Sequence, residues 1–267
     1  MIDNLIAWVT QLAWLSLCIV VPGLILYVAN EAWYATVGRY SKRIELATGI
    51  VGTPVHELSH AIMVKMFGMT VVEMALYQPD PQSKSLGYVS YSYRSRSLWH
   101  GIGRFFVGIA PLIGGGLVVY GMLWASDLPV LHNYIHFIDA GFFSAFGSWI
   151  EDLMRAVSRP VEIAAIALCT MVSTHATPSK ADMSGSLSGL ISLVVVYVGF
   201  RFLTSLFPVL SEQHIYPIIN LNTGAVSLAV LIIQMATFGA LASLFLSALT
   251  LGIGKMRTAF RQKRLFC

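Results

Sequence analysis

The sequence predicts an all-α integral membrane protein with about six transmembrane helices and a small β-hairpin between spans two and three. Of its 267 residues, 56% are hydrophobic and only 11% are charged, and the mean hydropathy is +0.71. Soluble domains carry about 25% charged residues, so this chain has too little polar surface to cover a globule in water. The apolar residues also form runs of about 20, the length of a helix that crosses a bilayer.

The expected spans follow these apolar runs in order along the chain. The first run lacks the basic residues that precede the apolar part of a cleaved signal peptide, so we expect it to be a retained span. A shorter stretch, Ala140–Ile150, is expected to lie at the membrane interface. With no internal repeat or soluble segment, the sequence predicts a single polytopic domain over residues 1–267. The six runs are Leu5–Ala29, Leu46–Met69, Ile102–Ala125, Val161–Thr174, Leu187–Phe207 and Gly224–Ile253.

Basic residues in the loops predict the orientation of the spans. The C-terminal tail carries a cluster of them, namely Lys255, Arg257, Arg261, Lys263 and Arg264. Cytoplasmic loops are enriched in such residues, so we expect this tail in the cytoplasm and, with six spans, the N-terminus there too. A basic tail beside a span is typical of an anchor on anionic lipid. A nucleic-acid partner, which requires a basic face on a soluble fold, is therefore not expected.

The polar stretch between spans two and three has the pattern of a β-hairpin. Thr70–Tyr77 is rich in strand-forming residues, Gln78–Pro81 has the composition of a turn, and Tyr88–Tyr93 alternates tyrosine with small or aliphatic residues. Such a hairpin is either a simple connector or an edge strand that pairs with an extended peptide. In span three, Pro111 and Gly114–Gly116 predict a loosened helix, and close packing through small residues is the favoured reason for them.

Span two contains a His-Glu-x-x-His motif formed by His56, Glu57 and His60. Four residues apart on a helix, the two histidines place their imidazoles on one face. Two such imidazoles bind Zn²⁺, which makes its bound water acidic near neutral pH. Glu57, next to the first ligand, is placed to accept the proton of that water and to return it to the leaving amine. The motif therefore predicts Zn²⁺ as the cofactor and Glu57 as the catalytic base.

The surroundings of the motif support a functional interpretation. Ionisable groups inside an apolar run are costly, and they indicate function by default. Thr53 and Pro54 have the composition of a helix start. They predict a helix over about 48–68 with the motif in its opening turns.

A catalytic zinc site needs a third protein ligand and one position left open for water. The region over about 173–186 supplies the best candidates, because it joins two apolar runs. Asp182, an isolated acidic residue there, is the expected third ligand. His175 is the alternative ligand; otherwise it hydrogen-bonds a ligand or the substrate. Without a metal, Asp182 would simply cap the helix that leads into the run Leu187–Phe207.

On these residues the chain resembles the site-2 protease family of intramembrane zinc metalloproteases. The likeness is carried by Gly52–Ala61 inside an apolar run and by Asp182 followed by a nearby glycine. It implies that the two histidines and Asp182 bind zinc, that Glu57 is the base, and that a β-structured loop follows the motif helix. It also implies cleavage of substrates within or beside a transmembrane helix. The family's usual Leu-Asp-Gly is here Ala181–Gly185, which indicates a divergent subgroup.

Three functions are open at this point. The first is a membrane-embedded zinc endopeptidase that acts on a membrane protein or peptide within the lipid bilayer. The second is a zinc protease with its motif at the membrane surface and a glutamate as third ligand, for which Glu151 and Glu162 are available. The third is a non-enzymatic membrane transporter or chaperone-like binder. Glu57 argues against the third, because metal binding alone needs no base beside the ligand.

Overall fold

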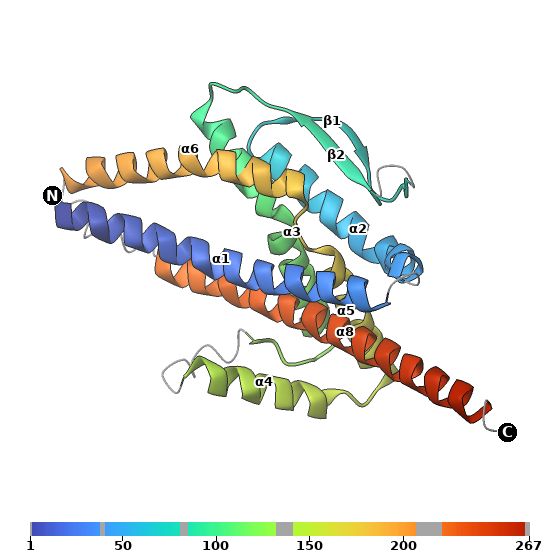
Figure 1. Cartoon of the computed structure of the whole chain (residues 1–267). Coiled ribbons are helices and arrows are strands. Elements are labelled where there is room, and N and C mark those ends of the chain that lie inside the picture. The colour runs from blue at the N-terminus through green and yellow to red at the C-terminus, as the bar shows by residue number, and fades with distance from the viewer. Residues whose placement is uncertain (1, 38–40, 81–84, 132–140, 207–220, 265–267) are drawn as a thin grey trace.

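The computed structural model of the chain describes residues 2–37, 41–80, 85–131, 141–206 and 221–264. They are mostly helical, with one small antiparallel sheet (Figure 1). The elements are α1 (Ile2–Val37), α2 (Ser41–Met66), β1 (Thr70–Ala75), β2 (Tyr88–Ser92), α3 (Leu98–Ala125), α4 (Phe142–Ala156), α5 (Pro160–His175), α6 (Lys180–Ser205) and α8 (Leu221–Arg264). Each predicted apolar run lies within one of these helices, apart from the last three residues of the second run and the end of the fifth, where Leu206 follows the helix and residue 207 lies outside the described residues.

Three helical segments in the described part of the chain are long and apolar enough to cross a membrane: Leu98–Ala125, Lys180–Thr204 and Ser227–Gly252. The six spans expected from the sequence are not confirmed. Helix α5 has 16 residues, fewer than the about 20 that a perpendicular span needs. Helix α2 mixes its apolar residues with polar and charged ones, both in the motif and in its first turns.

Helix α2 begins earlier than the sequence predicts. It starts at Ser41 instead of near residue 48, so the motif lies in its second half and Pro54 is inside the helix. The expected helix start at Thr53 is therefore wrong, and Thr53 is a buried residue within the helix. In apolar surroundings a backbone is satisfied most readily by continuing a helix, and neighbouring elements compensate for the bond that a proline removes.

The predicted hairpin is confirmed. Strands β1 and β2 pair antiparallel, with Thr70 opposite Ser92 and Ala75 opposite Tyr88, and a register shift lies near Val72. Across the strands, the hydroxyl of Tyr88 donates a 2.6 Å hydrogen bond to the carboxylate of Glu73, and this bond raises the pKa of Tyr88. Part of the predicted turn, residues 81–84, lies outside the described residues.

Helix α4 contains most of the stretch that the sequence assigns to the membrane interface, from Phe142 on, and residue 140 lies outside the described residues. It buries one face, formed by Ala145, Trp149 and Leu153 at helical spacing, against the main apolar core. The indole of Trp149 donates a hydrogen bond of 2.9 Å to the carbonyl of Pro129. The exposed fractions of Phe143 and Met154 on the remaining surface are 86% and 75%. Its position at an interface stays a prediction.

Helix α3 lies in the middle of the helical assembly and contacts α2, α5, α6 and α8 (Figure 1). It continues through Pro111 without a break. Its glycines allow close helix packing: Gly108 meets the backbone of Asp182, Gly114 meets Ser59, and a Cβ on Gly115 would lie 2.7 Å from the sulfur of Met235. The small residues of α3 therefore serve packing, and they bring α2 and α6 close together.

A buried polar network holds the connection between α5 and α6. The amide of Asn30 on α1 donates to the carbonyl of Thr174 at 3.0 Å and to the hydroxyl of Thr177 at 2.7 Å. The hydroxyl of Ser243 on α8 donates to the amide oxygen of Asn30 at 3.1 Å. Because buried polar groups are costly unless they are paired, this network fixes the segment that leads into the first turn of α6.

Candidate metal centre

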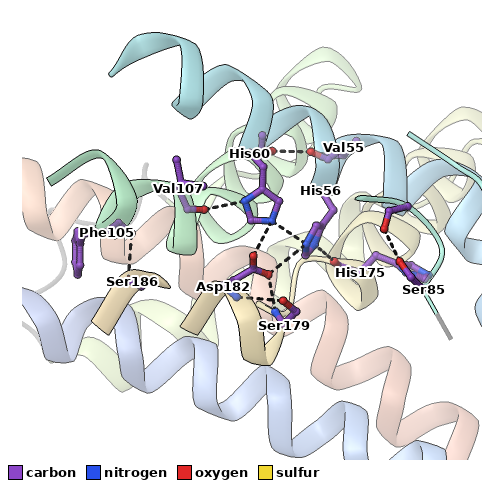
Figure 2. Close-up of polar contacts among 12 residues, drawn as sticks. Val55, His56, His60, Ser85, Phe105, Val107, His175, Ser179, Asp182 and Ser186 are labelled. Atoms are coloured by element: carbon purple, nitrogen blue, oxygen red, sulfur yellow. Dashed lines mark hydrogen bonds and ion pairs between the residues drawn. The ribbon is translucent and has the colours of Figure 1, made fainter. Parts of the chain in front are cut away.

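The fold brings the two histidines of the motif together with Asp182 (Figure 2). His56 and His60 come from α2, and Asp182 comes from the first turn of α6. One ligand atom from each residue lies within 4.8 Å of the others. The Nε2 atoms of the two histidines are 3.1 Å apart, and Nε2 of His60 is 3.3 Å from Oδ1 of Asp182. Nε2 of His56 lies 3.8 Å from Oδ2 of the same carboxylate.

Backbone carbonyls set the orientation of both imidazoles (Figure 2). Nδ1 of His56 lies 2.7 Å from the carbonyl oxygen of His175, and Nδ1 of His60 lies 2.8 Å from that of Val107. A carbonyl can only accept a hydrogen bond, so each Nδ1 carries the proton and donates. In a neutral ring this leaves the Nε2 lone pair free. Both free lone pairs face the same point beside Asp182.

Asp182 has a second role in its own helix. Ser179 is the N-cap of α6: its hydroxyl accepts from the backbone N–H of Asp182 at 3.2 Å. The backbone N–H of Ser179 donates in return to Oδ2 of Asp182 at 2.7 Å. This reciprocal pair is a capping box, which satisfies two otherwise unpaired helix donors. The expected capping role of Asp182 is confirmed in a changed form, because Ser179 is the N-cap and Asp182 is the third residue of the capping box. One carboxylate oxygen serves this cap and the other faces His60, so the role of Asp182 as a metal ligand stays a prediction.

Glu57 is buried beside this cluster, with an exposed fraction of 7%. Its carboxylate is close enough to His56, His60 and Asp182 to interact electrostatically with all three. It also packs against the residue before the second strand of the hairpin, since a Cβ on Gly87 would lie 2.9 Å from Cγ of Glu57. Glu57 therefore lies between the cluster and the backbone that enters β2.

The structure does not bring the side chain of His175 to the cluster. Its Nε2 is 2.9 Å from the hydroxyl of Thr48, one turn before Gly52 on α2, and only its carbonyl contacts a cluster residue. The two glutamates considered as third ligands lie elsewhere. Glu151 pairs with Arg155 on α4, and Glu162 caps the start of α5, about 20 Å along that helix from His175.

The three residues fit a tetrahedral metal ion. An ion with ligand distances of about 2.0–2.1 Å holds neighbouring ligand atoms about 3.3 Å apart. The 3.1 Å between the two Nε2 atoms and the 3.3 Å between Nε2 of His60 and Oδ1 of Asp182 match that value, whereas Nε2 of His56 lies 3.8 Å from the other carboxylate oxygen, Oδ2. Three protein ligands also leave one tetrahedral position open, which is the arrangement of catalytic sites.

Sequence reasoning missed the carbonyl of Val107 and the cap residue Ser179. It allowed for a hydrogen bond between His175 and a candidate ligand, and the carbonyl of His175 makes this bond with His56. Backbone acceptors leave no residue-type signal, so the carbonyl of Val107 was out of its reach. The spacing of Ser179 and Asp182 does carry one, since a serine followed three residues later by an acidic residue is typical of a capping box.

Comparisons of the chain with models of protein families, with curated proteins and with solved structures found no match.

Proposed function

We propose that this chain is a membrane-embedded zinc metalloendopeptidase that hydrolyses peptide bonds of membrane-associated or transmembrane substrates. The observation that carries the proposal is the approach of two imidazole Nε2 atoms to 3.1 Å with a carboxylate oxygen 3.3 Å from one of them. In neutral rings, with each Nδ1 proton committed to a carbonyl, both Nε2 atoms present lone pairs to each other. Two lone pairs and a carboxylate that converge in this way favour a cation between them.

The donor set favours zinc among the common cations. Two imidazole nitrogens and one carboxylate oxygen suit Zn²⁺ in tetrahedral geometry, whereas Mg²⁺ and Ca²⁺ prefer six or more oxygen ligands. The hydrogen bonds of the two histidines are also typical of a zinc site, because each ring donates its Nδ1–H to a backbone carbonyl.

Within such a site each residue has a defined part in hydrolysis. Zinc, when bound, supplies a Lewis acid that polarises the scissile carbonyl and makes water acidic near neutral pH. Glu57 accepts a proton as the water oxygen attacks the carbonyl carbon, and it returns the proton to the amine nitrogen as the C–N bond breaks. His56, His60 and Asp182 would hold the metal. The burial of Glu57 keeps bulk water from competing for its proton.

The hairpin supplies the path for the substrate. Peptide bonds inside a helix are shielded by their own hydrogen bonds, so a transmembrane substrate must unwind before it is cleaved. The backbone at Gly87, where β2 begins, packs against Glu57, so a peptide paired with the edge of this hairpin reaches the base in an extended form. This contact favours the edge-strand role of the hairpin over that of a connector.

In the membrane we propose a multi-pass arrangement with six spans and both termini in the cytoplasm. The three apolar helical segments support membrane insertion, and the basic C-terminal tail supports the orientation.

Metal analysis and cleavage assays on the purified full chain in detergent test the proposal. We expect about one zinc per chain in the wild type, and its loss in His56→Ala and Asp182→Ala. Glu57→Gln is the matched variant: it should keep zinc but cleave a pool of transmembrane-helix peptides at least about 100-fold more slowly. A metal content that neither ligand substitution changes would overturn the site, and full cleavage by Glu57→Gln would overturn the mechanism.

A further inference from the structure

One face of α2 carries Thr48, Gly52, His56 and His60 at successive intervals of four residues. Residues at this spacing lie one above another on a helix. The first three all contact His175 at the C-terminal end of α5. This row of residues on α2 therefore links the metal cluster to the contact between Thr48 and His175, two helical turns before His56.

Gly52 makes this contact very close. A Cβ on Gly52 would lie 2.7 Å from both Cβ and Cδ2 of His175, and 2.5 Å from the carbonyl oxygen of Met171. A real Cβ does not approach other heavy atoms to such distances. The end of α5 thus packs directly on the backbone of α2 at this point.

His175 is held by α2 at two points. The hydroxyl of Thr48 donates to the carbonyl of Ile44 at 2.9 Å, so it accepts the Nε2–H of His175, also at 2.9 Å. The carbonyl of His175 in turn accepts from Nδ1 of His56 at 2.7 Å. That carbonyl belongs to the last residue of α5, where helix carbonyls lack an intrahelical partner and helix ends fray.

We propose that His175 is a positioning residue for the metal ligand His56. Its ring, anchored on Thr48, keeps the end of α5 against α2. Its carbonyl then holds the Nδ1–H of His56, so that Nε2 points at the metal. This inference rests on the proposed metal site, and it gives His175 a role other than metal ligand or substrate contact.

The test measures metal binding by the purified full chain in detergent. Zn²⁺ affinity is obtained by competition with a chelator, and the visible absorption bands of bound Co²⁺ report the ligand geometry. Thr48→Val and His175→Phe remove one partner each, and Thr48→Val does so at nearly constant volume. We expect each to weaken Zn²⁺ binding by about 10-fold or more and to alter the Co²⁺ bands, because outer partners of liganding histidines typically contribute 10–100-fold. The double variant should lose no more than the stronger single variant, since both break one link.

Two further variants separate positioning from general loosening. His175→Gln carries an N–H donor at a similar reach, so it should recover most of the affinity. Leu153→Ala leaves a cavity beneath α4 in the apolar core, and it should lower the melting temperature while Zn²⁺ affinity stays within about twofold.

Wild-type affinity and Co²⁺ bands in both Thr48→Val and His175→Phe would overturn the inference and leave the metal site standing. An equal loss in Leu153→Ala would also overturn it, since the effect would then be general loosening. A wild-type chain that binds neither metal would overturn the proposed function and this inference together.

Discussion

Replacing Gly52 by alanine should weaken metal binding more than it destabilises the fold. The added Cβ meets atoms of α5 at 2.5–2.7 Å, whereas ordinary contacts begin near 3.4 Å. The end of α5 must therefore retreat by roughly 0.7–0.9 Å. Overpacking of this kind costs about 1–3 kcal/mol, and the better helix propensity of alanine offsets about 1 kcal/mol of it. The net loss of stability is thus about 0–2 kcal/mol.

The same retreat carries the carbonyl of His175 away from His56, whose hydrogen bond is 2.7 Å long in the native arrangement. A lengthening of most of an ångström breaks that bond, so we expect Zn²⁺ affinity to fall by about 10–100-fold. Chelator competition measures the affinity, and tryptophan fluorescence during heating measures the stability of the same sample.

Gly121→Ala in α3 is the matched control, because a Cβ there meets nothing within 4 Å. It should bind Zn²⁺ as the wild type does and be equally stable or slightly more stable. A Gly52→Ala chain with Zn²⁺ affinity within twofold of the wild type would refute the idea that this close contact sets the metal ligand.

Three further outcomes follow from the site. Ser179→Ala should cost about 1 kcal/mol of stability through the lost cap but keep Zn²⁺ affinity within about tenfold of the wild type. Asp182→Asn should lower Zn²⁺ affinity by more than tenfold. Equal losses of affinity in the two variants would mean that Asp182 acts only as a cap. Removing the metal with a chelator should lower the melting temperature of the wild type but not of His60→Ala, and the same shift in both would place the metal elsewhere. Gly87→Val should slow peptide cleavage by at least about tenfold while the zinc content stays at the wild-type level, because its side chain would press on Glu57; unchanged cleavage would remove the hairpin from the substrate path.

The sequence predicts the pair of histidines in the cluster because local helix geometry determines their relative position. His56 and His60 share a face through their spacing alone, and the polar, alternating stretch before Leu98 predicts the hairpin. Asp182 could be singled out from the sequence because it is an isolated acidic residue between two apolar runs. These inferences depend on spacing and residue type, which the sequence displays directly.

Long-range packing decides the features that sequence reasoning missed. The polar first turns of α2 and α6 extend both helices beyond their apolar runs, so helix starts read from hydropathy fall too late. The contact of His175 with Thr48 joins residues 127 positions apart, and no local pattern reports it. Hydropathy alone also treats α5 as a span, although its 16 residues form a helix of about 24 Å.

The capping box at the start of α6 makes the length of the preceding connection part of the metal centre. Residues 176–181 separate the carbonyl of His175 from Asp182, and only the first four of them precede helix α6. Inserting or deleting a single residue among those four would change the span between that carbonyl and the capping box, and we expect it to move the carboxylate away from the histidines while leaving every candidate ligand in the chain. This short connection is therefore as constrained as the ligands themselves.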